Sequence, residues 1–65
     1  MSEVVSQIPL AEQVACAERE LQKRKKFYPK WVVERGMNPL KAEREIAAME
    51  AIVDTLKHVK QPLLL

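Results

Sequence analysis

The sequence predicts an all-α protein, a two-helix antiparallel hairpin that forms a single domain over residues 1–65. Apolar residues recur at helical spacing on both sides of the middle of the chain. The only glycine, Gly36, and the pair Asn38-Pro39 stand together between these two periodic segments. Hydrophobic residues make up 48% of the chain, a content that is typical of a folded rather than a disordered protein.

The first helix is expected over about residues 9–35. Pro9 suits a first helical turn, because its missing N–H would have no partner there. Arg24 occupies a gap in the apolar seam, where its guanidinium either reaches out of the core along its stem or pairs with an acid of the second helix. At Pro29 we expect a kink rather than a stop, because the helical spacing continues across it. The apolar seam consists of Leu10, Val14, Ala17, Leu21, Tyr28 and Trp31.

The chain is expected to reverse at residues 36–38. Gly36 is a natural left-handed helix stop, and Asn38-Pro39 pairs an N-cap residue with a first-turn proline. A second helix is therefore expected over about residues 39–60. Because the connection is so short, the two helices must be antiparallel neighbours.

The two apolar seams are expected to supply the core and a dimer seam. A chain of 65 residues has little stability to spare, because ordering costs about 1.5 kcal/mol per residue and two helices bury only one seam. We therefore expect homodimerisation into a four-helix bundle. Residues 1–7 are expected to be a flexible N-terminus and residues 61–65 an apolar C-terminal tail. The expected core and dimer residues are Leu10, Val14, Leu21, Ile46, Met49, Val53 and Leu56.

Residues that would support catalysis or hold a cofactor are not evident in the sequence. It has no Gly-rich phosphate loop and no nucleophile beside a base. One cysteine, Cys16, and one histidine, His58, do not make a zinc-ligand pattern. The first residues lack the basic and apolar regions of a signal peptide, and no apolar run approaches membrane-spanning length. We expect a non-enzymatic cytoplasmic protein with no cofactor, no metal and no membrane contact.

A basic and aromatic patch near the end of the first helix is the main candidate site. Residues 19–35 hold seven bases and two acids, a local balance of +5, whereas the whole chain carries only +2. Aromatic rings beside Arg and Lys are typical of protein interfaces. The bases have another explanation, because positive charges at a helix C-terminus complement the helix dipole. Tyr28 and Trp31 also continue the apolar seam, so these two rings could serve the core, the dimer seam or partner contact. The expected partner-binding residues are Lys23, Arg24, Lys26, Tyr28, Lys30 and Trp31.

Two segments of the chain resemble a group of small proteins encoded by temperate phages of Gram-negative bacteria. They are Tyr28-Pro29-Lys30-Trp31-Val32 and, in the second helix, Lys41-Ala42-Glu43-Arg44-Glu45-Ile46 with Met49-Glu50-Ala51-Ile52. The match covers about residues 9–57, and the expected shape is similar to that of phage anti-quorum-sensing (anti-activator) proteins. The resemblance implies a phage-encoded homodimer that binds and inhibits a host protein, such as a transcriptional activator or another host or defence factor, in the bacterial cytoplasm.

Two alternative functions stay open. The basic stretch of the first helix would also suit a small nucleic-acid-binding regulator, because aromatic rings stack on bases while Lys and Arg contact phosphates. The modest net charge and the lack of a helix-turn-helix pattern argue against this alternative. The other alternative is an assembly or scaffolding component of a phage.

Overall fold

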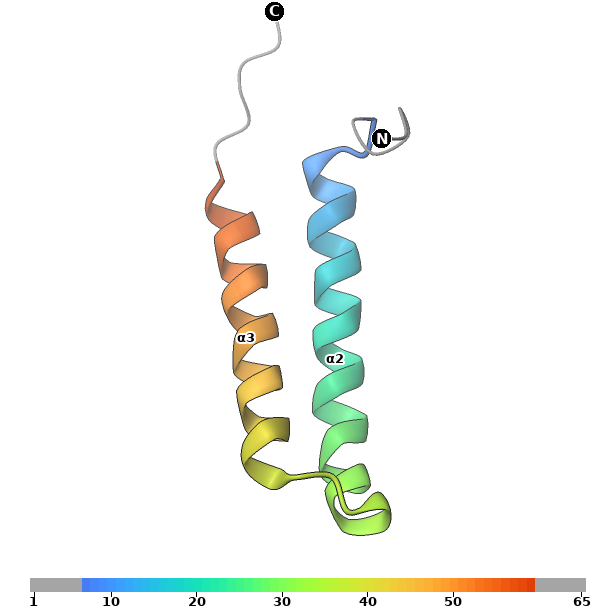
Figure 1. Cartoon of the computed structure of the whole chain (residues 1–65). Helices are drawn as coiled ribbons and strands as arrows, with labels where there is room; N and C mark the ends of the chain where they lie inside the picture. Colours follow the sequence, from blue (N-terminus) through green and yellow to red (C-terminus); the bar gives the residue numbers. More distant parts are fainter. Residues whose placement is uncertain (1–6, 60–65) are drawn as a thin grey trace, which may run out of the picture.

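A computed structural model describes residues 7–59, which form two helices joined by a tight turn. Helix α2 spans Leu10–Arg35 and helix α3 spans Pro39–His58. The helices lie side by side and antiparallel, so that the start of α2 and the end of α3 share one end of the molecule (Figure 1). The predicted helical hairpin is confirmed for this part of the chain. Apart from Gln7, the predicted flexible N-terminus and apolar C-terminal tail lie outside the described residues.

Helix α2 runs for 26 residues and continues through Pro29. Pro9 is its N-cap, with extended backbone angles (φ −67°, ψ 154°), so the helix begins one residue later than the sequence predicts. The Pro9 carbonyl accepts hydrogen bonds from the N–H groups of Glu12 and Gln13, each at 3.1 Å. The predicted continuation across Pro29 is confirmed, whereas the kink stays a prediction.

The turn has the backbone that its residues predict. Gly36 ends α2 with φ of 68°, and the N–H of Met37 donates to the carbonyl of Trp31 at 3.1 Å. The side chain of Asn38 then caps α3, because its Oδ1 accepts from the N–H of Lys41 at 3.0 Å. Helix α3 begins at Pro39, as predicted, and ends at His58.

We expect Gly36→Ala to lower the free energy of unfolding by about 1 kcal/mol, because an L-residue is strained in the left-handed region. A β-carbon at Gly36 would meet no other atom within 4 Å, so the loss should come from the backbone angle alone. Urea unfolding followed by circular dichroism measures it. Gly36→Asn is the matched control and should lose less, because Asn tolerates this backbone region better than Ala. Equal losses for Ala and Asn would contradict the backbone explanation.

The core is a short stripe along the line where the helices meet. Ala17 and Leu21 of α2 and Met49 and Val53 of α3 are buried against one another. Ile46 and Leu56 are partly buried against this cluster, Leu10 and Val14 are half-buried, and Ala42 is buried nearer the turn. Five of the seven residues that the sequence assigns jointly to core and dimer thus pack in the core of the hairpin itself, namely Leu21, Ile46, Met49, Val53 and Leu56. A dimer would have to use other exposed surface as well.

Three ion pairs within residues 7–59 connect the helices. Arg24 contacts Glu45 (Nη1 to Oε2, 3.6 Å), Lys25 contacts Glu50 (Nζ to Oε2, 3.4 Å), and Lys57 contacts Glu18 (Nζ to Oε2, 2.8 Å). Arg24 is the least exposed of the three bases, since only 22% of its side chain is accessible to solvent. Each pair lies at the edge of the hairpin, where an exposed ion pair adds only about 0–1 kcal/mol to stability.

Candidate functional site

The aromatic part of the candidate site is a ladder of three rings on α2. Spacings of three and four residues place Phe27, Tyr28 and Trp31 next to one another on the helix surface. The ring centroids of Phe27 and Trp31 are 5.9 Å apart with planes at 24°, and those of Tyr28 and Trp31 are 5.5 Å apart with planes at 33°. Tyr28 and Trp31 are half-buried, and Phe27 is 37% exposed. The ladder therefore leaves aromatic surface open to a partner.

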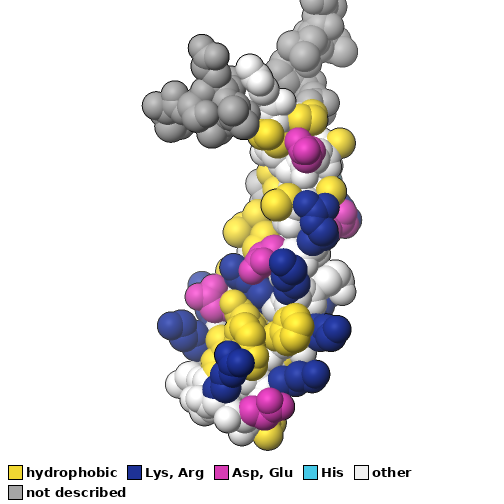
Figure 2. Space-filling view, turned by 90° about the vertical axis from the view of Figure 1, so that its right-hand side faces the viewer, with side chains coloured by type: hydrophobic (Ala, Val, Ile, Leu, Met, Phe, Trp, Pro, Cys, Tyr) yellow, Lys and Arg dark blue, Asp and Glu magenta, His cyan; other side chains and the backbone are white. Residues whose placement is uncertain are grey.

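Cationic groups lie over all three rings. The guanidinium carbon of Arg35 is 5.0 Å from the Trp31 centroid, and Lys26 Nζ is 5.5 Å from the Phe27 centroid. Arg24 lies over Tyr28 at 5.9 Å. Figure 2 shows this side of the molecule, with hydrophobic side chains gathered toward the turn and Lys and Arg side chains around them. The cation over each ring adds attraction of about 0.5–1 kcal/mol at an exposed site.

The predicted partner-binding bases have two different roles in the structure. Arg24 is tied into the hairpin, because its Nε contacts Glu20 at 3.3 Å and its Nη1 donates to the carbonyl of Glu45 at 3.0 Å. The sequence left open whether Arg24 points outward or pairs with an acid of the second helix, and it pairs with Glu45. Lys23, Lys26 and Lys30 are exposed and form no ion pair with any described residue. These three lysines are therefore the bases available to a partner.

A shallow groove runs between the three rings and the side chains of Lys23 and Arg24. Its volume is about 400 Å³, and it lies along the side of α2 just before the last helical turns. Phe27 lines it and is not among the partner contacts that the sequence predicts. The four-residue spacing from Phe27 to Trp31 was the signal that could have found it. The residues that line the groove are Glu20, Lys23, Arg24, Phe27, Tyr28 and Trp31.

The outward side of α3 is unusually apolar for an exposed helix face. Leu40 is 76% exposed and Ile52 is 48% exposed. Between them lie exposed alanines and a shallow hollow lined by Arg44, Ala47, Ala48 and Ala51. Arg44 forms no ion pair within residues 7–59. Small side chains let a second helix approach closely, so this face is a candidate for contact with another helix.

The described residues do not contain a group of three His, Cys, Asp or Glu side chains that could hold a metal ion. Cys16 is exposed, and His58 contacts Asp54 of its own helix, with Nδ1 and Oδ1 3.4 Å apart. Neither α2 nor α3 has the length and apolar character needed to cross a membrane. The interactions that the candidate site can make with a partner are ring stacking, apolar contact and ion pairing.

Comparisons with protein-family models, curated proteins and solved structures found no match for this chain.

Proposed function

We propose that this hairpin is a phage-encoded, non-enzymatic binding protein that inhibits or modulates a host protein in the bacterial cytoplasm. The observation that carries the binding role is the ring ladder of Phe27, Tyr28 and Trp31 with the unpaired Lys23, Lys26 and Lys30 around it. Trp, Tyr and Arg are enriched at the hot spots of protein interfaces, and exposed charges around them steer a partner of opposite charge. The phage origin and the host target are supported by the resemblance of residues 9–57 to small phage proteins.

The proposed target surface is acidic at its rim and apolar at its centre. Such a surface would place carboxylates opposite the three lysines and an apolar side chain in the groove beside Phe27 and Trp31. Arg24 would contribute mainly by fixing Tyr28, because its guanidinium is already held by Glu20 and Glu45. A transcriptional activator or another host or defence factor is the proposed class of target.

The proposed active form is a homodimer that pairs two hairpins into a four-helix bundle. The support is the exposed face of α3 with Leu40, Ala47 and Ala51, which would be covered by the same face of a second copy. Along this face Arg44, Ala47, Ala51 and Asp54 follow one another at spacings of three, four and three residues. An antiparallel two-fold contact centred midway between the two alanines therefore brings Arg44 near Asp54 of the partner subunit. The basic and aromatic patch lies on α2 and stays free in this arrangement.

We expect the triple charge reversal Lys23→Glu, Lys26→Glu and Lys30→Glu to abolish capture of the target while leaving the helical fold intact, because all three side chains are exposed and form no ion pair within residues 7–59. The measurement is affinity capture from a bacterial lysate with the tagged protein, followed by mass spectrometry of the captured proteins. Arg19→Glu with Lys41→Glu is the control, because it reverses exposed bases outside the basic and aromatic patch. Capture of the same proteins by the folded triple variant and the native chain would remove the patch from the proposal.

The same patch also favours a second candidate, a nucleic-acid-binding regulator, because exposed lysines beside stacked rings suit single-stranded DNA. A gel shift with single-stranded and duplex DNA at physiological salt separates the two functions. A complex that weakens steeply as salt is raised would favour the nucleic-acid function. Absence of a complex at micromolar protein would leave the protein target as the proposal.

A further inference from the structure

The flank of the hairpin opposite the Arg24–Glu45 pair carries a regular series of ionic contacts that stops before the turn. Glu18 pairs with Lys57, and seven residues further along α2, Lys25 pairs with Glu50. Seven residues further again come Val32 on α2 and Glu43 on α3, which both line one hollow. Val32 offers no charge, and Glu43 has no ion pair within residues 7–59.

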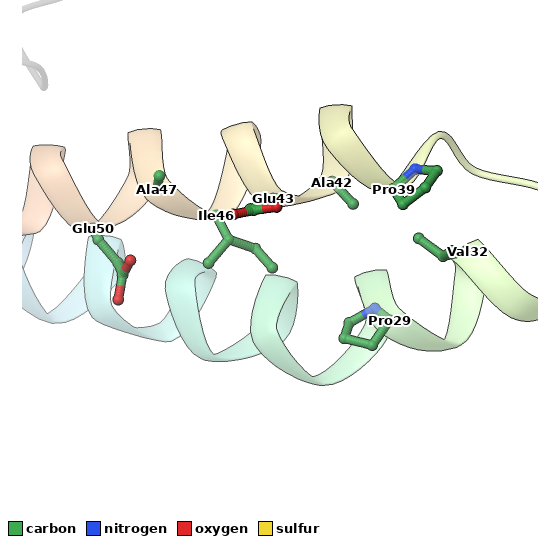
Figure 3. A pocket seen from close by; sticks show the side chains of 8 residues that line it. All are labelled: Pro29, Val32, Pro39, Ala42, Glu43, Ile46, Ala47 and Glu50. Carbon is green, nitrogen blue, oxygen red and sulfur yellow. The ribbon is translucent and has the colours of Figure 1, made fainter.

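A hollow lies on this flank between the Lys25–Glu50 pair and the turn, where a third ion pair would continue the series. Its volume is about 510 Å³, and it is open to solvent on one side. Figure 3 shows Pro29 and Val32 of α2 facing Ile46 and Ala42 of α3 across it. The hollow exists because the side chains of Ala42 and Val32 are short and the ring of Pro29 stays close to its own helix. In the core, the longer side chains of Leu21 and Met49 fill the space between the helices.

The chemistry of this hollow differs from that of the basic and aromatic patch. Its walls are apolar, and the two carboxylates on its edge, Glu43 and Glu50, give it a negative rim. Lys25 Nζ lies 3.4 Å from Glu50 Oε2 and neutralises that carboxylate. The carboxylate of Glu43 is the one on this rim that no described residue neutralises. An anion would be repelled, and a purely apolar group would leave Glu43 unpaired. A long side chain with an aliphatic stem and a cationic head meets both requirements.

We propose that this hollow, defined by Pro29, Val32, Ile46 and Glu43, binds an arginine side chain of a partner protein. The aliphatic stem lies on Pro29, Val32 and Ile46, and the guanidinium takes the place of the missing cation beside Glu43. Arginine suits the site better than lysine, because its guanidinium is less strongly hydrated and donates two parallel hydrogen bonds to one carboxylate. This second surface has the opposite charge to the patch on α2 and does not depend on the function proposed for that patch.

The test is a titration of the full chain with n-butylguanidinium, followed by the shifts of backbone amide signals in 15N-resolved NMR spectra. The neutral analogue n-butylurea has the same shape and is the matched ligand control. We expect n-butylguanidinium to shift signals of residues 43–47 and of Val32, with half-saturation on the order of millimolar. Glu43→Gln should weaken this binding by about threefold, the size of an exposed ion pair, and should leave the binding of n-butylurea unchanged.

A second variant, Val32→Lys, supplies the missing cation from the chain itself. It should place an amine beside Glu43, fill part of the hollow and abolish the n-butylguanidinium shifts. Target capture through the patch on α2 should be unchanged in both variants. A failure of the arginine site can therefore be distinguished from a failure of the proposed function.

Equal binding of the two ligands, or unchanged binding of n-butylguanidinium in Glu43→Gln, would overturn the proposal. NMR shifts confined to residues 23–31 on addition of n-butylguanidinium would also overturn the proposal. Light scattering supplies a further criterion: conversion of a dimer into a monomer by Glu43→Gln would assign the site to a second copy of this chain and overturn the arginine partner.

Discussion

Leu21→Ala is expected to leave a large fraction of the protein unfolded at 25 °C. Leu21 is 7% exposed and packs in the small cluster with Ala17, Met49 and Val53. Truncation of a buried Leu to Ala costs about 2–5 kcal/mol. A chain of 65 residues has a total stability of roughly 3–10 kcal/mol, and a hairpin with so few buried side chains belongs near the low end of this range. The loss should therefore remove most of the stability.

Urea unfolding followed by circular dichroism at 222 nm measures this loss. Val33→Ala is the matched control on the same helix, because Val33 is 84% exposed, and its unfolding midpoint should change little. Alanine is a better helix former than leucine, so helix propensity cannot explain a loss at Leu21. The experiment should be run at two protein concentrations, since dimerisation would make the midpoint concentration-dependent. Equal midpoints for Leu21→Ala and Val33→Ala would show that the hairpin core does not hold the fold.

Reversal of a single charge on the outward face of α3 is expected to weaken the proposed homodimer enough to yield monomers at a protein concentration near its dissociation constant. In the antiparallel contact, Arg44→Asp would place two pairs of acids opposite each other, and Asp54→Arg would place two pairs of bases opposite each other. Like charges at these positions should weaken self-association by about tenfold or more, which corresponds to about 1.4 kcal/mol. Light scattering coupled to gel filtration should change from about twice the chain mass of 7.5 kDa to the mass of one chain.

A mixture of the two variants gives the sharpest result. In the mixed dimer, the acid introduced by Arg44→Asp in one chain would face the base introduced by Asp54→Arg in the other. The native Arg44 and Asp54 would face each other at the second contact, so both contacts become attractive and only the mixed dimer should form. The double variant Arg44→Asp/Asp54→Arg should dimerise with itself again for the same reason. Native mass spectrometry distinguishes the species. If each single variant remains a homodimer, then α3 does not form the interface, and if the native chain is a monomer, the four-helix bundle is wrong.

The patch on α2 shows how far side-chain chemistry follows from local sequence. Spacings of three and four residues determine that Phe27, Tyr28 and Trp31 stack on one helix surface, and the structure gives the distances. Local spacing could not predict which bases pair with acids of the other helix and which bases do not. Arg24 and Lys25 are adjacent in the sequence, yet they pair with Glu45 and Glu50 at opposite edges of the hairpin, whereas Lys23 and Lys26 form no ion pair with any described residue. The partners of Arg24 and Lys25 come from the other helix, so they depend on the interhelical register.

The local residues of the sequence determined the two helices and the reversal between them. Gly36 permits the left-handed backbone, and Asn38 and Pro39 start α3, so the turn needs no distant contact. Only the tertiary structure decided which acids and bases pair, and that Val32 and Glu43 line the same hollow. The physical reason is that register is set by packing of Leu21 against Met49 and Val53, a contact between residues far apart in the chain. The candidate arginine site is a consequence of that register and has no signature in either helix alone.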